Sequence, residues 1–447
     1  MTCPCPAEAP EPLFAKLNPG NGGPGPEAVA RSQRGRLMGA MLEAVGRHGY
    51  GPTTLRELVA LAGVSKATFY THFESKEACF LASFEEIVER GAREVEEAGR
   101  AGPGGRERLG ATLALLARRI AAEPAAARLV LVDSPTLGAA SVPARRRAAA
   151  RLGALLREAL GTEPGEISEL RMRGIAGGLL NNAYRAVRRG EPGALAARVP
   201  ELADWVLECA DPSLAGAARS PGAELVARVR GAGTPARERA GESAGLPWEE
   251  PANSERSRRA LSQLERLRRG AAQLAVERGY AALSIPAISA AAGVSNQTFY
   301  QHFDSTEEAF LAAFEELAQG ALATSAAAHK AHDDPLLAAI AGLLALLERL
   351  AAEPLLRALA LFELPAAGPE TLGRAEAISE LFTNFLRPGP AHEGAGGRPT
   401  DAVFEAIIGG LWAIVAVEAI EGRGESLTNL APEMVDFVLV AYRPGGR

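Results

Sequence analysis

The chain contains one long stretch of sequence twice. Residues 60–86 read ALAGVSKATFYTHFESKEACFLASFEE, and residues 290–316 read AAAGVSNQTFYQHFDSTEEAFLAAFEE, at an offset of 230. A glycine pair later in each copy, at 177–178 and 409–410, matches at an offset of 232. Short solenoid repeats have periods of roughly 20 to 50 residues, so this spacing excludes them. We therefore predict two tandem copies of one domain-sized unit.

The composition predicts an all-α fold for both units. Apolar residues make up 47% of the 447 residues and aromatic residues only 5%. A core of alanine and leucine with few β-branched runs favours helices. The net charge of −6 excludes a uniformly basic chain that coats nucleic acid, so DNA contact would need a local basic patch.

The chain divides into six expected segments. They are a disordered extension at 1–30, a helix-turn-helix head at 31–77, a helical body at 78–212, a flexible linker at 213–253, a second head at 254–307 and a second body at 308–443. The apolar stretch 406–417 is too short to span a bilayer, which needs about 20 residues. We expect it to be a buried helix and expect no membrane partner. The absence of a signal peptide and of zinc-spaced cysteines predicts a cytoplasmic protein without cofactor or metal.

The first head has the pattern of a helix, a tight turn and a second helix. Thr54 with Glu57 is typical of a capping box, Gly63 suits a left-handed turn, and Ser65 is a good cap for the next helix. The second helix of such a motif enters the major groove of DNA, between base edges and phosphates. The candidate DNA-binding residues are Thr54, Ser65, Lys66, Ala67, Thr68, Tyr70, Thr71, His72 and Lys76.

The second head repeats this pattern with different polar residues. Its candidate DNA-binding residues are Ser284, Ser295, Asn296, Gln297, Thr298, Tyr300, Gln301 and His302. Asparagine and glutamine are suited to bidentate contacts with adenine. Arginines precede both motifs, at Arg31, Arg34, Arg36 and Arg47 in the first copy and at Arg256, Arg258, Arg259, Arg266, Arg268 and Arg269 in the second. A capping box is also expected at Ser305 and Glu308.

The motif GVSxxTFYxHF followed by S-x-E, present in both copies, resembles the TetR family. The resemblance covers about 31–212 and 254–443. It implies a three-helix DNA-binding head, a helical effector-binding body, and dimerisation through the last two long helices. The family commonly has lysine where the second copy has Asn296 and Thr306, so the second head is expected to bind phosphate more weakly or to read other bases.

These observations predict a DNA-binding transcriptional regulator, a repressor relieved by a small-molecule effector. Both heads on one chain would form an intrachain pseudo-dimer on an asymmetric operator, with a dimer of chains as the alternative. Helices at 166–189, 195–210, 402–421 and 429–442 are expected to form a four-helix interface, or else ordinary internal packing. The side chains of Phe362, Phe382, Phe385 and Trp412 line an effector pocket or belong to the ordinary core.

Two other functions compete with this one. No Ser/His/Asp set, phosphate-binding loop, metal cluster or paired-carboxylate arrangement is evident, so catalysis is not expected. A protein–protein adaptor or partner subunit, in which only the first head binds DNA, is the alternative. Substitution of Asn296 and Gln297 discriminates the two, because an adaptor would keep its operator affinity.

Overall fold

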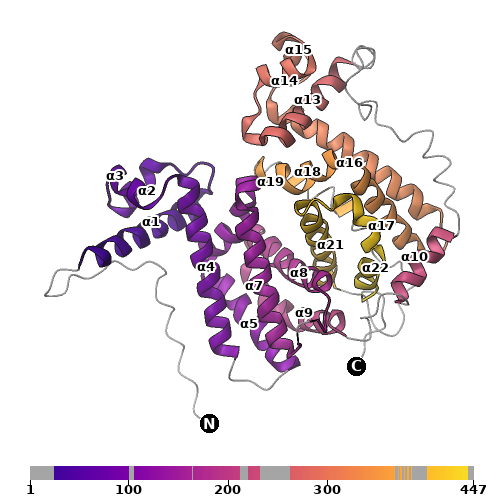
Figure 1. Cartoon of the computed structure of the whole chain (residues 1–447), viewed down its shortest axis with the longest axis horizontal. Helices are drawn as coiled ribbons and strands as arrows, with labels where there is room; N and C mark the ends of the chain where they lie inside the picture. The colour runs from indigo at the N-terminus through magenta and orange to yellow at the C-terminus, as the bar shows by residue number, and fades with distance from the viewer. Residues whose placement is uncertain are drawn as a thin grey trace.

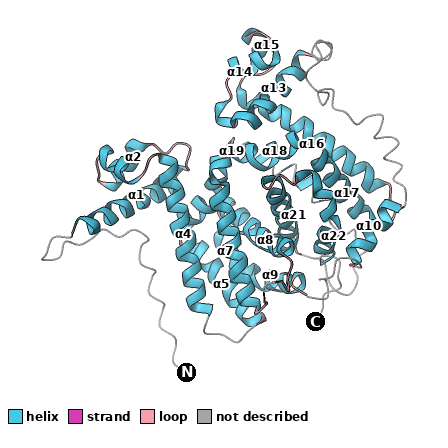
Figure 2. Ribbon diagram, viewed as in Figure 1, coloured by secondary structure: helices cyan, strands magenta, loops and turns pink. Residues whose placement is uncertain are grey.

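The computed structural model describes residues 25–99, 105–163, 165–211, 220–231, 262–367 and 400–440, with seven further positions between 371 and 384. Over these residues the chain is built from helices and contains no strand, as Figure 2 shows. The all-α fold expected from the composition is therefore confirmed. Residues 1–24 and 232–253 of the expected extension and linker lie outside the described residues.

The first unit has a head of three helices followed by a longer helical body. The head contains α1 (Pro26–His48), α2 (Leu55–Ala62) and α3 (Lys66–His72), and the body contains α4 (Lys76–Gly99), α5 (Arg106–Ala122), α6 (Pro124–Arg128), the π-helix η1 (Leu129–Asp133), the 3-10 helix η2 (Ser134–Ser141), α7 (Val142–Leu160), α8 (Glu169–Arg188), the short η3 (Pro192–Ala194) and α9 (Leu195–Cys209). Pro26 occupies the first turn of α1, where a missing N–H costs nothing. The first helix therefore begins inside the segment expected to be disordered.

The second unit follows the same order. Its head contains α13 (Gln263–Arg278), η6 (Tyr280–Ala282), α14 (Ile285–Ala292) and α15 (Asn296–Tyr300), and its body contains α16 (Thr306–Lys330), α17 (Pro335–Ala352), α18 (Pro354–Ala358), the π-helix η7 (Leu359–Glu363), α19 (Leu364–Ala366), α21 (Asp401–Ile420), η9 (Gly424–Leu430) and α22 (Ala431–Leu439). Helix α13 is capped by Ser262 and Glu265, whose side chains each accept from the other's backbone amide. Sequence reasoning missed this capping box because the expected boundary lay eight residues earlier, at 254.

Part of the expected linker is a helix of the second body. Helix α10 (Pro221–Gly231) packs on α22. The amide of Gly222 donates to the Asp436 carboxylate over 2.7 Å, and Val226 and Val229 are buried. These two valines, three residues apart, share one helical face, so the expectation of a flexible segment is wrong for these residues.

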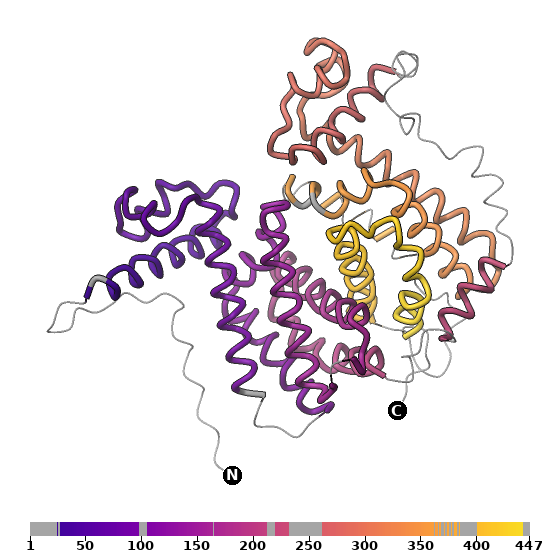
Figure 3. The backbone as a smooth tube through the Cα atoms, in the orientation of Figure 1, coloured from indigo at the N-terminus to yellow at the C-terminus, as the bar shows by residue number. Residues whose placement is uncertain are grey.

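The two heads project from the bodies, and the bodies lie side by side (Figure 1). Each head has its own small core, around Phe69 in the first and Phe299 in the second. One large core runs through both bodies and includes Ile175 and Trp205 from the first and Ile414 and Phe437 from the second. The tube in Figure 3 shows the late helices of the two bodies at this boundary.

Helices α8, α9, α21 and α22 pack together at that boundary within one chain. Helix α8 crosses α21 at the glycine pairs, where a Cβ on Gly177 would overlap Ala413 and a Cβ on Gly409 would overlap Asn181. The backbones therefore approach as closely as glycine allows. The rings of Trp205 and Phe437 meet edge to face with centroids 5.6 Å apart.

Helices α17 and α21 are long and apolar enough to cross a membrane by length and composition. Of their most apolar windows, 50% and 56% of the residues are buried inside the molecule. Helix α17 packs against α16, and α21 packs against α8. The apolar stretch 406–417 thus forms part of a core helix, as expected.

Candidate DNA-binding surface

The first helix-turn-helix is held by local hydrogen bonds at its helix caps, but only half of the capping box expected at Thr54 and Glu57 forms, since the Glu57 carboxylate lies 3.0 Å from the His48 Nε2. The hydroxyl of Thr54 accepts the Glu57 amide over 3.2 Å, and the Ser65 hydroxyl accepts the Thr68 amide over 3.0 Å. Between the two helices Gly63 adopts φ +61°, a left-handed conformation that glycine enters without steric cost. These contacts orient α3 with the Phe69 ring buried beneath it.

The opposite side of α3 is exposed to solvent. Lys66 and Ala67 are exposed at its first turn, the side chain of Tyr70 is 52% exposed, and Thr71 is exposed one residue later. The Lys66 ammonium lies 5.9 Å from the centre of the Tyr70 ring. Because the second helix of a helix-turn-helix enters the major groove with its exposed side chains, this face is the candidate surface for DNA.

His72 and its neighbours close the C-terminal end of α3. The His72 Nε2 lies 3.1 Å from Oε1 of Gln33, and its carbonyl accepts from the Arg34 guanidinium over 3.2 Å. Burial, and secondarily the charge of Arg34, lowers the pKa of His72. The expected set missed Gln33, whose only signal is its place on the first helix of the motif.

Lys76 is engaged by the protein. Its ammonium donates to the carbonyls of Tyr50 and Thr53 over 3.1 and 2.9 Å and lies 4.1 Å from the centre of the Tyr50 ring. Burial lowers the pKa of Lys76, and a desolvated ammonium needs acceptors of this kind. Lys76 therefore joins α4 to the loop before α2 and is less available to phosphate than the sequence predicts.

The second head presents an equivalent face. Ser284 and Ser295 cap their helices by accepting the amides of Ala287 and Thr298, and Gly293 adopts φ +63°. Asn296 and Gln297 are exposed at the first turn of α15, and the Tyr300 side chain is 59% exposed.

Helix α15 ends earlier than its counterpart in the first head. It stops at Tyr300, so Gln301 is its C-cap and His302 lies beyond it; both side chains are exposed. The expected capping box at Ser305 is also altered, because the Glu308 carboxylate accepts the amide of Asp304, over 2.7 Å. The second recognition helix is therefore shorter and reaches less far along a groove.

The arginines ahead of the second motif have mixed roles. Arg266 donates to the carbonyl of Ala292 over 3.0 Å and so supports the turn. Arg268 pairs with Glu316 over 3.0 Å. Three earlier members of the set lie outside the described residues, namely Arg256, Arg258 and Arg259. The basic lead-in is thus partly used inside the protein.

Comparison with protein families decides what these heads are. A family model described as "Bacterial regulatory proteins, tetR family" matches residues 37–83 and again residues 267–313. The chain carries two TetR-family DNA-binding domains. The two matches coincide with the two helix-turn-helix heads and with the start of the first helix of each body. Both heads are thus DNA-binding domains of a family of bacterial regulatory proteins.

Solved structures of TetR-like regulators show limited similarity to the chain. The fatty acid degradation regulator FadR from Bacillus halodurans is 19% identical with a TM-score of 0.36, over 39% of this chain and 94% of that one. FadR from Bacillus subtilis, solved in complex with stearoyl-CoA, is 17% identical with a TM-score of 0.35, over 38% and 96%. The TetR-family regulator PfmR from Thermus thermophilus is 22% identical with a TM-score of 0.31, over 42% and 100%. A search of curated proteins gives no match.

Proposed function

We propose that the chain is a cytoplasmic, sequence-specific transcriptional repressor whose two heads bind the two halves of one operator as an intrachain pseudo-dimer. The packing of α8 on α21 carries this proposal. Gly177 of the first unit lies against Ala413, and Gly409 of the second unit lies against Asn181. At the repeat offset of 232, Gly177 corresponds to Gly409 and Asn181 corresponds to Ala413, so the two contacts are equivalent. A two-fold interface pairs residues in this reciprocal way, so the two bodies are arranged like two subunits of a dimer.

The operator of such a pseudo-dimer would be asymmetric. Lys66, Ala67 and Thr71 of the first head correspond to Asn296, Gln297 and Gln301 of the second. Lysine contacts guanine and phosphate, whereas asparagine and glutamine bond the N6 and N7 edge of adenine. Two heads with these side chains would prefer different half-sites.

The second body contains a small apolar cavity of about 40 Å³, which would have to widen to hold an effector, because ligand sites usually measure roughly 300–1,000 Å³. It lies between α17, α21 and α22, and its lining includes Leu343, Leu347, Leu350, Leu411, Trp412 and Met434. Trp412 is the one residue of the expected pocket whose side chain is described there; Phe382 and Phe385, and the side chain of Phe362, lie outside the described residues. An effector bound here would be largely apolar, and its binding would relieve repression.

The experiment is a titration of the protein onto labelled DNA from its own upstream region, followed by fluorescence anisotropy across a salt series. Tyr70→Ala and Tyr300→Ala are measured beside the wild type, and random-sequence DNA is the control. We expect specific binding that weakens steeply with salt and weakens further with either substitution. Binding of the wild type no tighter than to random DNA would count against the proposal.

A second candidate is a partner subunit in which the first head alone binds DNA. The shorter α15 and the presence of Asn296 where the first head has Lys66 favour it. Asn296→Ala combined with Gln297→Ala would then leave operator affinity unchanged. The repressor with two reading heads requires this variant to bind its operator more weakly.

A further inference from the structure

The contact between the two bodies is nearly symmetric in shape. A Cβ on Gly178 would overlap the carbonyl of Ala406, and a Cβ on Gly410 would overlap the carbonyl of Gly174. These residues correspond to each other at the offset of 232. Glycine pairs occur in both units, so steric fit alone would also allow either unit to pair with a second copy of itself.

The charges across the same contact are not symmetric. Among the described residues, six ion pairs join the two bodies, and in each the arginine belongs to the first body and the glutamate to the second. They are Arg146–Glu421, Arg173–Glu418, Arg185–Glu380, Arg185–Glu405, Arg189–Glu405 and Arg198–Glu405. The interface is thus basic on one side and acidic on the other.

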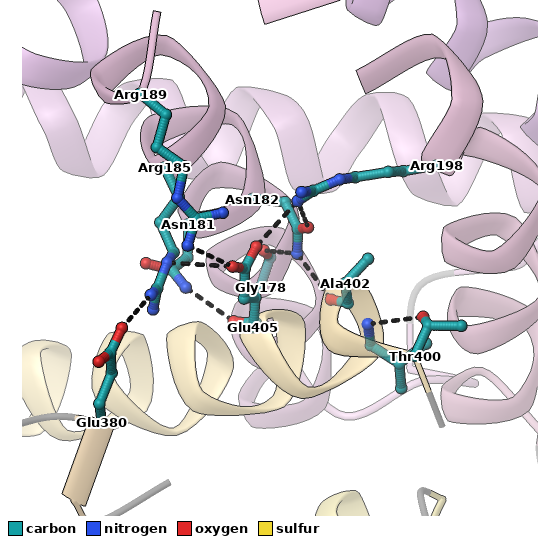
Figure 4. A network of polar contacts seen from close by, with 11 residues as sticks. Gly178, Asn181, Asn182, Arg185, Arg189, Arg198, Glu380, Thr400, Ala402 and Glu405 are labelled. Carbon is teal, nitrogen blue, oxygen red and sulfur yellow. Dashed lines mark hydrogen bonds and ion pairs between the residues drawn. The ribbon is translucent and has the colours of Figure 1, made fainter. Parts of the chain in front are cut away.

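Glu405 is the centre of this network (Figure 4). Its side chain is 10% exposed, and its carboxylate lies 3.2 Å from Arg185, 3.1 Å from Arg189 and 2.9 Å from Arg198. Asn181 donates to the Glu405 carbonyl over 2.7 Å, and the buried Asn182 donates to the Ala402 carbonyl over 3.0 Å. The buried Glu405 carboxylate is tolerated because the three arginines replace its water. Removing these arginines would be strongly unfavourable, since the charge would remain buried without a partner.

The sequence repeat shows what pairing of like units would bring together. Arg173 occupies the position that Glu405 has in the second unit, and Arg189 occupies the position of Glu421. In the observed pair of units, Arg189 forms an ion pair with Glu405. At the position related to this one by the repeat, the positive charge of Arg173 attracts the Glu421 carboxylate. Two first units would instead place arginine against arginine, and two second units would place glutamate against glutamate.

A neighbouring arginine does not remove this difference. Arg423 of the second body bonds Glu418 over 2.7 Å and also bonds Glu421. Two carboxylates then share one guanidinium, so this end of α21 is still acidic. At the corresponding C-terminal end of α8 in the first body, Arg185 and Arg189 both pair with carboxylates of the second body.

We infer that this separation of charge is a pairing code, which directs the first unit to the second unit and rejects a second copy of either. The inference rests on the proposed pseudo-dimer and goes beyond it, because it states why the chain closes on itself. Specificity of this kind comes from repulsion in the wrong pair as much as from attraction in the right one. Similar glycine contacts supply affinity in all three pairings, and the charges select one.

The test uses the full chain and measures its mass by light scattering after size exclusion. The wild type should have the mass of one chain. Glu405→Arg should open the closed form, because the new arginine faces Arg185, Arg189 and Arg198, and should form a dimer of chains, because it can also pair with Glu421 of a second copy. Glu405→Gln, which adds no repulsion, should stay monomeric with a lower melting temperature.

Two further variants test the inference at exposed positions, because a substitution at the buried Glu405 could simply prevent the chain from folding. Arg189→Glu changes a side chain that is 43% exposed, and it should likewise shift the chain from monomer to dimer. Glu85→Arg is the matched control, since Glu85 is 51% exposed and pairs with Arg147 inside the first body; it should stay monomeric. Monomeric Glu405→Arg and Arg189→Glu chains, or a dimeric wild type, would overturn the inference.

The outcome is separable from that of the DNA titration. A wild type that binds no DNA, with the expected change in mass for both variants, would refute the repressor and support the code. A wild type that binds its operator specifically, with both variants still monomeric, would support the repressor and refute the code.

Discussion

The backbone amide of Tyr50 donates a hydrogen bond to the Asp133 carboxylate over 2.9 Å, and this bond ties the first head to the first body. The second unit has the same bond, from the Tyr280 amide to the Glu363 carboxylate over 2.7 Å. Each carboxylate is the last residue of a π-helix, Leu129–Asp133 or Leu359–Glu363. Single π-helical turns often lie at functional sites, and here one ends at each junction between a body and its head.

The first prediction concerns this junction. Asp133→Ala should lower the free energy of unfolding by about 1–3 kcal/mol, because the partly buried Tyr50 amide loses its acceptor. Asp133→Asn should lower it less, since its amide oxygen still accepts and since burial, which raises the pKa of Asp133, disfavours the charged form. Urea denaturation measures both. Equal losses for the two variants would show that the acceptor is not what matters.

The second prediction separates the two lysines of the first head. Lys66→Ala should reduce the slope of log affinity against log salt by about 1, as expected for one phosphate contact, and should leave the melting temperature unchanged. Lys76→Ala should do the reverse, lowering the free energy of unfolding by about 1–2 kcal/mol, because its ammonium bonds two carbonyls. If Lys76→Ala alone changed the salt slope, the assignment of the two lysines would be wrong.

The third prediction concerns the glycines between the bodies. Gly178→Ala and Gly410→Ala should each lower the free energy of unfolding by about 1–3 kcal/mol, as overpacked side chains do, because the new Cβ meets the carbonyl of Ala406 or of Gly174 across the interface. Gly110→Ala in α5 is the matched control, since a Cβ there meets nothing within 4 Å. That variant should gain up to about 1 kcal/mol of helix propensity. Three similar thermal melts would contradict close packing at the interface.

Much of the fold could be predicted because it depends on neighbours in the sequence. The caps at Ser65 and Ser295 and the turns at Gly63 and Gly293 involve residues at most a few positions apart. Capping and turn chemistry therefore describe them well. Helix α10 was instead expected to be part of a flexible linker, because its place in the second body depends on the tertiary contact with Asp436.

The roles of charged side chains were harder to predict because their partners are distant in sequence. Lys76 bonds carbonyls 26 and 23 residues away, and Arg198 pairs with Glu405 from 207 residues away. Residue type alone predicts that Lys76 binds DNA, and it offers no explanation for the presence of Glu405 in a core helix. The opposite charges at positions 173 and 405 were visible in the repeat, but their meaning needs the crossing of α8 and α21.

The last prediction is a pH dependence of DNA affinity that originates at His72. Burial, then the charge of Arg34, lowers the pKa of His72 below its usual value near 6.5, so the free head carries it neutral at pH 7. A nearby phosphate would favour the protonated form. Binding then takes up a proton, and the affinity should rise as the pH falls from about 8 towards 6.

His72→Gln isolates this effect, because glutamine keeps a polar side chain but cannot take up the proton. Anisotropy titrations at constant ionic strength should show a steeper rise in affinity at low pH for the wild type than for the variant, by up to one proton per first head. His302 of the second head supplies the comparison, as His302→Gln leaves the Gln33 contact of His72 intact. Identical pH profiles for the wild type and His72→Gln would mean that His72 lies away from phosphate in the complex.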